Sequence, residues 1–303
     1  MTTPGSTPTP TPTPASAPAP HPLRTTAFPD VRRPDAATAL VSAWIVPDPG
    51  VLRPAAEAVL GEWERQPRPD AMLSLSVFLG ADGRHLLNYA QWTDDDAHRE
   101  WVRTRRPAAI GRVDDALPGI ERPGPVRYRR HRSYVPRRPQ QAPGDRPTLL
   151  VTPTFATTGP DAQRALADTV VDELVRAQVP GLLGAHVHLS QDGHRALNFA
   201  EWTGEEAWRT FATGEVAARL RAAIAALEGV TPAAPLGAAP QLPGGPGAAE
   251  APDASGTPTP THYRLYQSLV NIPASAPADT RDPISAEAPA NALAPRATSS
   301  EGA

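Results

Sequence analysis

The sequence predicts an α+β fold in which one chain carries two copies of the same unit. Three observations lead to this prediction. The 39 prolines of the 303-residue chain concentrate in four stretches, which separates low-complexity segments from two packable regions. A twelve-residue segment that starts at Asp82 recurs at Asp192. Both copies also show β-type and helical patterns in the same order: strand, helix, two strands, helices and a last strand.

The first half of each copy reads as a strand, a helix and a hairpin. Residues 39 to 46 are β-branched and aromatic enough to form a strand, which ends at Pro47. An amphipathic helix follows, because apolar residues recur at i, i+3, i+4 and i+7, namely Ala56, Val59, Leu60 and Trp63. Asp82-Gly83 lies between two alternating apolar segments, which predicts a hairpin turn of the kind that needs positive φ.

The second half of each copy is predicted to be helical before its last strand. Residues 93 to 96 and 203 to 206 both start with Thr and carry acidic residues, as helix N-termini do. A further helix around residues 110 to 117 has its counterpart at 220 to 227. Tyr128 of the last strand corresponds to Tyr263, because the second copy gains 25 residues of Pro, Ala and Gly before Thr261.

These patterns give the following domain boundaries. Residues 1–37 are expected to be a disordered Pro/Thr-rich tail, 38–135 the first domain and 136–147 a linker. Residues 148–272 are the second domain with a Pro/Gly/Ala-rich insertion at 231–260, and 273–303 are a second disordered tail.

The hairpin register predicts which side chains share a face of the sheet. If Asp82 and Gly83 are the central turn residues, Val77 lies opposite Asn88, Leu75 opposite Ala90, and Leu73 opposite Trp92. The same register in the second copy places Val187 opposite Asn198 on the face of Trp202. Each copy thus has a single amide on an apolar wall, and a dry amide needs a hydrogen-bond partner from the fold, a water or a ligand.

Composition excludes several kinds of chemistry. All 29 basic residues are arginine, and there is neither lysine nor cysteine, which removes Schiff-base, P-loop and thiolate chemistry. The basic run of Arg127, Arg129, Arg130 and Arg132 has no nucleic-acid-binding motif around it, so no nucleic-acid partner is expected. No apolar run is long enough for a membrane span or a secretory segment, so a cytoplasmic protein without a membrane partner is expected.

The repeated Asn-x-x-x-Trp strand after an Asp-Gly hairpin, followed by Thr-x-x-acid-Ala, resembles the antibiotic biosynthesis monooxygenase family. The resemblance covers residues 38–135 and 148–272. It implies two ferredoxin-like domains whose antiparallel sheets pack into an α+β barrel, here within one chain as a pseudo-dimer that is free to oligomerise further. The Asn/Trp faces would then lie under the helices, and the opposite faces would meet inside the barrel.

The same resemblance implies a cofactor-independent monooxygenase that oxidises an aromatic polyketide, such as an anthrone, naphthol or quinol, with O2 in secondary metabolism. Asn88, Trp92, Asn198 and Trp202 would be the catalytic residues, hydrogen-bonding the substrate oxygen and the oxygen adduct. We expect a substrate-binding role for Leu73, Leu75, Val77, Val187, His98 and Arg112. His98 and Arg112 belong to the first copy alone, because their counterparts are Trp208 and Ala222.

Other activities are weighed against this hypothesis. His186 and His188 share a strand face, as a metal pair would, but no third ligand has recognisable spacing, so no metal is expected. Haem-degrading relatives carry a His ten residues after the motif Trp, where this chain has Val102 and Ala212. A non-oxidative polyketide cyclase and a non-catalytic ligand-binding module of the same fold remain alternatives.

Overall fold

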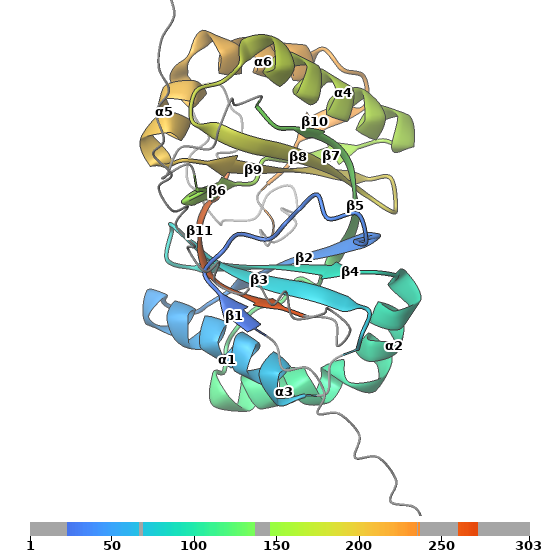
Figure 1. The fold of residues 1–303 in the computed structure, drawn as a ribbon, viewed down its shortest axis with the longest axis vertical. Helices are drawn as coiled ribbons and strands as arrows, with labels where there is room; N and C mark the ends of the chain where they lie inside the picture. The colour runs from blue at the N-terminus through green and yellow to red at the C-terminus, as the bar shows by residue number, and fades with distance from the viewer. Residues whose placement is uncertain (1–22, 67–68, 137–145, 235, 237–259, 272–303) are drawn as a thin grey trace, which may run out of the picture.

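The computed structural model describes residues 23–66, 69–136, 146–234, 236 and 260–271. The strands lie in the middle of the molecule, with one group of helices at each end (Figure 1). The first copy supplies α1 (Leu52–Arg65), α2 (Asp95–Thr104) and α3 (Arg106–Ala116), and the second supplies α4 (Pro160–Ala177), α5 (Glu205–Thr213) and α6 (Glu215–Ala225). The predicted α+β class with two ferredoxin-like sheets is confirmed.

The strands of the first copy are β2 (Thr38–Ile45), β3 (Met72–Gly80), β4 (His85–Trp92) and β5 (Val126–Tyr134). Those of the second are β6 (Leu149–Val151), β7 (Thr154–Thr157), β8 (Leu182–Ser190), β9 (Arg195–Trp202), β10 (Val230–Pro232) and β11 (His262–Val270). A short strand β1 (Leu23–Thr25) and a 3-10 turn η1 (Pro49–Val51) complete the described elements.

The last strand of each copy crosses into the sheet of the other copy. Strand β5 pairs with β2 of its own copy and with β8 of the second. Strand β11 pairs with β6 of its own copy and with β3 of the first. Antiparallel pairing therefore runs β11-β3-β4-β2-β5-β8-β9-β6 and back to β11, which closes a barrel of eight strands. Closure leaves neither sheet with an open edge along this path.

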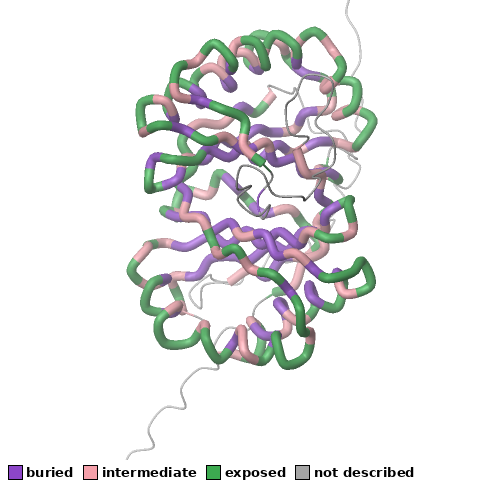
Figure 2. The backbone as a smooth tube through the Cα atoms, turned by 180° about the vertical axis from the view of Figure 1, so that it is seen from behind, coloured by how far each residue is buried: buried purple, intermediate pink, exposed green. Residues whose placement is uncertain are grey.

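The barrel interior is a packed core shared by both copies. Phe78 and Phe199 contact each other edge to face with ring centroids 5.9 Å apart, and Tyr89 lies 4.9 Å from Phe199. Tyr128 and Tyr263, the matched residues of the two crossing strands, are fully buried in the same cluster. Buried residues concentrate in these central strands (Figure 2). The predicted meeting of the two inner faces is thus confirmed.

The predicted register holds over most of each hairpin and fails at its far end. Val77 lies opposite Asn88 and Leu75 opposite Ala90, as expected, but Trp92 lies opposite Met72 and not Leu73. An irregularity between Met72 and Ser74 shifts the register there, and the second copy has the same shift between Leu182 and Gly184. A β-bulge is local and leaves no trace in a period-two pattern, so the prediction for Leu73 was wrong.

The turn chemistry of the hairpin also differs in detail from the expectation. The amide of Gly83 donates to the Gly80 carbonyl over 3.1 Å, so Gly83 ends the turn. Gly83 has a φ of 71° and the matching Gly193 one of 80°, whereas Gln178 is the one described non-glycine residue with positive φ. The glycine therefore carries the left-handed conformation, and Asp82 instead accepts the backbone amides of Arg84 and His85.

Part of the predicted N-terminal tail belongs to the folded structure. Strand β1 pairs with β11, and Val31 is buried in the barrel core. The rest of the two predicted tails, residues 137–145 of the linker and most of the 231–260 insertion lie outside the described residues. Within the described chain, no helix combines the length and apolar character needed to cross a membrane.

Candidate functional site

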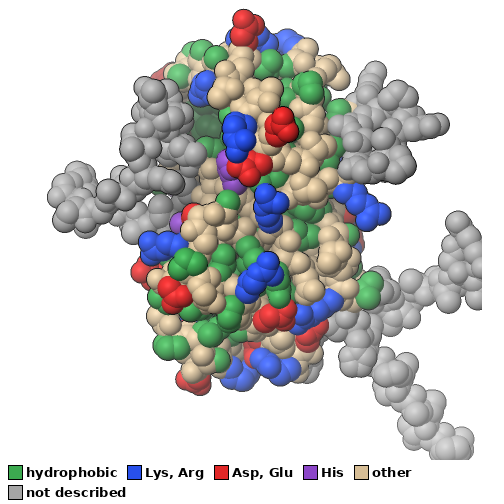
Figure 3. All heavy atoms as spheres, turned by 90° about the vertical axis from the view of Figure 1, so that its left-hand side faces the viewer, with side chains coloured by type: hydrophobic (Ala, Val, Ile, Leu, Met, Phe, Trp, Pro, Cys, Tyr) green, Lys and Arg blue, Asp and Glu red, His purple; other side chains and the backbone are tan. Residues whose placement is uncertain are grey.

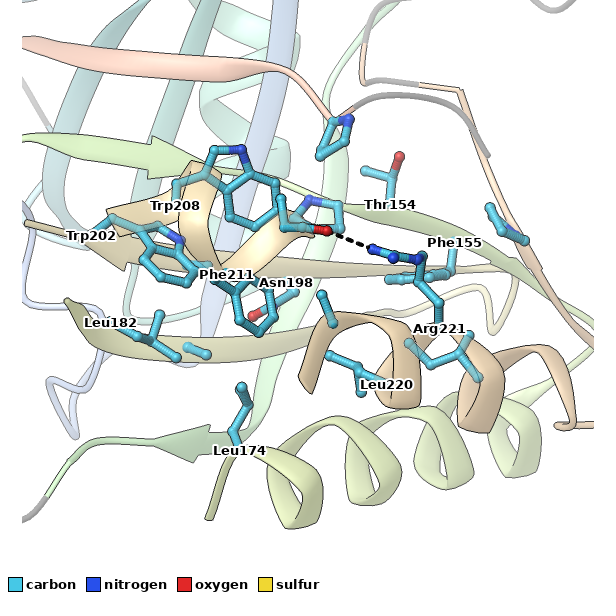
Figure 4. A pocket seen from close by; sticks show the side chains of 18 of the residues that line it. Thr154, Phe155, Leu174, Leu182, Asn198, Trp202, Trp208, Phe211, Leu220 and Arg221 are labelled. Carbon is cyan, nitrogen blue, oxygen red and sulfur yellow. Dashed lines mark hydrogen bonds between the residues drawn. The ribbon is translucent and has the colours of Figure 1, made fainter. Parts of the chain in front are cut away.

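Each copy has a pocket between the outer face of its sheet and the helices that cover it, and the pocket of the second copy is the larger of these two. Its volume is about 340 Å³. Strands β8 and β9 form its floor and helices α5 and α6 its cover (Figure 4). Most of the lining is apolar, including Leu182, Ala185, Ala200, Leu220 and Ile224. The pocket therefore suits a ligand with a large apolar surface.

Three polar groups of this pocket have buried atoms without a hydrogen-bond partner. They are Oδ1 of Asn198, Nε1 of Trp202 and Nε2 of His262. Burying an unpaired polar atom costs about 1–3 kcal/mol. Three such atoms around one pocket indicate that a ligand or water completes their hydrogen bonds.

Aromatic rings form one continuous wall of the pocket. Trp208 lies between two of the polar groups, with its ring centroid 5.3 Å from that of Trp202 and 5.6 Å from that of His262. Phe211 lies 5.2 Å from Trp202. Figure 4 shows Trp202, Trp208 and Phe211 together on one side of the pocket, with Arg221 on the opposite side.

Arg221 brings the one cationic side chain of this lining. Its Nη1 donates to the Ala212 carbonyl over 3.0 Å, which ties α6 to the end of α5. The side chain is exposed, so its charge lies at the rim of the pocket and not in its apolar interior. An anionic oxygen on a ligand would be favoured at that rim.

The first copy has an equivalent but smaller pocket of about 100 Å³. Its unpaired buried atoms are both amide atoms of Asn88, Nδ1 of His98 and Nε1 of Trp101. Burial lowers the pKa of His98 to about 4, and the charge of Arg127 acts in the same direction, so the ring is neutral near pH 7.

Extra aromatic side chains narrow this first pocket. Trp63 stacks on Trp101 with centroids 4.4 Å apart and an interplanar angle of 18°. His98 also packs against Trp92, with ring centroids 4.9 Å apart. The position that corresponds to Trp63 in the second copy is Glu173, so the second copy lacks this ring.

The predicted site residues divide between the pockets and the surrounding core. Leu75, Asn88, Trp92 and His98 line the first pocket, and Asn198 and Trp202 line the second. Leu73, Val77 and Val187 are buried in the sheet but line neither pocket.

Arg112 lines neither pocket itself, but it forms an ion pair with Glu62, a buried residue that lines the first pocket. Its guanidinium bonds the carboxylate of Glu62, and that contact holds the pKa of Glu62 below its usual range. Arg106, at the start of α3, lines the first pocket instead. A buried carboxylate that needs a partner was not visible in the sequence pattern, which is why Arg112 was misplaced.

Sequence reasoning did not identify His262 or Arg221 as residues of the second pocket. The counterpart of His262 is Arg127 and that of Arg221 is Gly111, so the repeat did not point to them. Alternation along the strand could have identified His262: Tyr263 points into the barrel, so the side chain before it points outward, toward the helices.

The His186-x-His188 pair lies on the barrel side of β8. His188 Nδ1 bonds the His186 carbonyl over 2.9 Å, and its Nε2 bonds the Tyr89 hydroxyl over 3.1 Å. His186 Nδ1 bonds Ser133, which belongs to the other copy. Both rings thus serve contacts between the copies. The described residues contain no group of three or more His, Asp or Glu side chains placed to hold a metal ion.

Comparison with known proteins places the chain near monooxygenases. No family model matches the chain. A segment of 53 residues is 40% identical to tetracenomycin-F1 monooxygenase of Streptomyces glaucescens; it covers 16% of this chain and 46% of that protein, so the match spans about half of that relative. The chain resembles the antibiotic biosynthesis monooxygenases.

Solved structures give further likenesses. An anthrone oxidase-like protein is 14% identical, with 77% of this chain and 92% of that one covered and a TM-score of 0.49. A monooxygenase of Streptomyces coelicolor in complex with nanaomycin D is 31% identical over 30% of this chain and 90% of that one, with a TM-score of 0.26.

Proposed function

We propose that this protein is a cofactor-independent monooxygenase that oxidises a hydroxylated polycyclic aromatic compound with O2, and that its working site is the second-copy pocket. The observation that carries the proposal is the apolar pocket with Asn198 Oδ1 and Trp202 Nε1 buried and unpaired. The names of the relatives support a monooxygenase.

Pocket size favours the second copy over the first. Small-molecule sites commonly measure about 300–1,000 Å³. The second pocket, at about 340 Å³, lies within that range, whereas the first, at about 100 Å³, is well below it. A molecule of three fused rings is therefore assigned to the second pocket alone.

The chemistry requires a substrate anion that reduces O2 directly. Loss of a proton from an anthrone methylene gives an enolate, which passes one electron to O2 and then combines with the resulting superoxide to form a C–O bond. Protonation gives a hydroperoxide. Loss of the second methylene proton with cleavage of the O–O bond then yields the ketone and one water. The methylene loses four electrons and O2 gains four, so the reaction balances without a further reductant.

The residues of the pocket fit the demands of this sequence. The Nδ2 group of Asn198 can donate to the substrate oxygen as negative charge develops, and its unpaired Oδ1 can accept from a substrate hydroxyl. The Trp202 indole can donate to the peroxide. Both groups stay neutral, which an apolar pocket requires. The aromatic wall of Trp208 and Phe211 provides ring faces against which a planar substrate can pack.

Oxygen uptake with 1,8-dihydroxyanthrone tests the proposal. We expect Asn198→Ala to lower the turnover rate by about 10²–10³-fold, the effect of removing one such hydrogen-bonding group. The matched change Asn88→Ala in the small pocket should leave the rate within about threefold. Turnover without oxygen would instead indicate a cyclase, and saturable binding without turnover a binding module; either result contradicts the proposal.

A further inference from the structure

His262 lies on the same face of the sheet as the Asn198 and Trp202 side chains. Its neighbour Tyr263 points into the barrel core, so strand alternation turns His262 outward to the helices. In the register of the sheet, Val151 of β6 pairs with His262 on one side and with Ala200 on the other. Ala200 is two residues from both Asn198 and Trp202, so these side chains share the floor of one pocket.

The spacing of these strands suits a planar ligand of about three rings. His262 and Ala200 are two strands apart, which corresponds to about 10 Å between their backbones. Side chains that lean into the pocket from both positions shorten this gap. A substrate whose oxygen contacts Asn198 can therefore present the opposite edge of its ring system to the imidazole.

His262 has the chemical character of a base. Its Nε2 is buried and has no hydrogen-bond partner, and its ring contacts Trp208 edge to face. Besides His262, the one ionisable side chain among the described lining residues is Arg221, a cation that cannot accept a proton at neutral pH. Among the described lining residues, His262 is thus the group able to take a proton from a ligand.

We propose that His262 is the general base of the second pocket and removes the proton that forms the substrate anion. This inference rests on the proposed function. The neutral imidazole takes the first methylene proton and returns it to the peroxide anion. It then takes the second methylene proton as the O–O bond breaks, and the imidazolium neutralises the departing hydroxide to give water.

The charges around His262 are compatible with this role. Burial lowers the pKa of the imidazole, Glu205 of α5 opposes this, and Arg209 adds to it. Arg264 lies 3.7 Å from the Glu205 carboxylate and partly offsets that charge. On the side of the β3–β4 turn, Asp82 is already bonded to His85. Figure 3 shows the side of the molecule with α5 and β11, where acidic and basic side chains lie among apolar ones. The net result is a ring that is neutral at pH 7 and ready to accept a proton.

The test separates proton removal from oxygen chemistry. Wild-type protein and His262→Gln are mixed with 1,8-dihydroxyanthrone under argon, and the absorption band of the bound anion is recorded against pH. With wild-type protein, the bound compound should ionise at a lower pH than the free compound does, and with His262→Gln it should not. Quenching of tryptophan fluorescence by the ligand should show that both proteins bind it similarly. His194→Gln, an exposed histidine on the β8–β9 turn, is the matched control and should behave like wild type.

Aerobic turnover gives the second measurement. We expect His262→Gln to lower kcat by about 10²-fold or more at pH 7 with KM within about threefold, and its residual rate to rise with pH as the substrate ionises by itself. Equal anion formation in wild type and His262→Gln, or no anion in either, overturns the role of His262. Anion formation in wild type without oxygen uptake leaves His262 as a base and refutes the oxygenase instead.

Discussion

At the residue scale, the two repeated asparagines illustrate what a pattern can predict. Strand alternation placed Asn88 and Asn198 on an apolar face of the sheet, and the family resemblance implied that this face lies under the helices. The structure puts each asparagine beside a pocket. The catalytic role of Asn198 stays a prediction, whereas Asn88 lines the pocket that we expect to be too small for the substrate. The side chains that distinguish the pockets, such as Trp63 and His262, come from positions at which the copies differ, so the repeat does not point to them.

We predict that Asn88→Leu does not destabilise the protein. Both amide atoms of Asn88 are buried and unpaired, so an apolar side chain of similar volume removes a desolvation cost. The free energy of unfolding in urea should stay the same or rise by about 1 kcal/mol. A loss of more than about 1 kcal/mol would mean that the amide is hydrogen-bonded in solution.

A second residue-scale prediction concerns pH. Burial lowers the pKa of His188 to about 3, so the folded protein binds this proton far less readily than the unfolded chain, in which a histidine has a pKa near 6.5. With respect to His188, the free energy of unfolding therefore has its full value above pH 6.5 and falls as the pH drops from 6.5 toward 3. The expected slope is about 1.4 kcal/mol per pH unit for each such proton, and His98 adds to it down to about pH 4.

Urea unfolding at several pH values between 4 and 7 measures this slope. His188→Gln should reduce it by about one proton, whereas the exposed His194→Gln should not change it. An unchanged slope in His188→Gln would show that His188 is not the group that titrates on unfolding.

At the element scale, the regular strands and helices were predictable, and their irregularities were not. Alternation located the hairpins and the i, i+3, i+4 spacing located α1, because burial on one face imposes both patterns. The starts of α2 and α5 were predicted from their capping residues instead. The bulges near Leu73 and Leu183 are local irregularities within each hairpin, and the crossing of β5 and β11 depends on the sheet of the other copy. The two matched helix starts also differ: the Asp94 side chain accepts the Ala97 amide, while Gly204 offers no side-chain cap to α5.

The ion pair between β5 and α4 links elements of different copies and gives a further test. Arg132 bonds Asp168 over 2.6 Å and Asp172 over 3.0 Å. Because all three side chains are partly exposed, Arg132→Ala should lower the free energy of unfolding by only about 0.5–1 kcal/mol, and less in 1 M NaCl.

Arg103→Ala is the matched control, since Arg103 pairs with Glu100 inside one helix and is more exposed. It should cost about 0.3 kcal/mol or less. If the two variants lose the same stability at low salt, the ion pair between the copies stabilises the protein no more than an ion pair within one helix.

At the scale of the whole molecule, the crossing strands make the two copies one folding unit. Neither sheet is complete without β5 or β11, each of which pairs with both copies. The sequence showed a duplication, and the resemblance implied a joint barrel. Which strands exchange partners could not be predicted, because pairing between sheets leaves no periodicity in either copy.

We therefore expect one cooperative unfolding transition, with tryptophan fluorescence and far-UV circular dichroism coinciding. Phe78→Ala, which removes a ring from the shared core, should lower the free energy of unfolding by about 3–5 kcal/mol and keep a single transition. Val175→Ala, at an exposed position, should have little effect. Two separate transitions would show that the copies unfold independently.

The covalent joining of the copies has one more consequence, which concerns how the sites can diverge. In an assembly of two identical chains every substitution appears twice, so an aromatic ring that fills one pocket also fills the equivalent pocket of the other chain. Here Trp63 lies at the first pocket, and the corresponding residue of the second copy is Glu173. In the same way, His98 of the first copy corresponds to Trp208 of the second. One half is thereby free to act as a rigid scaffold while the other is shaped for its ligand.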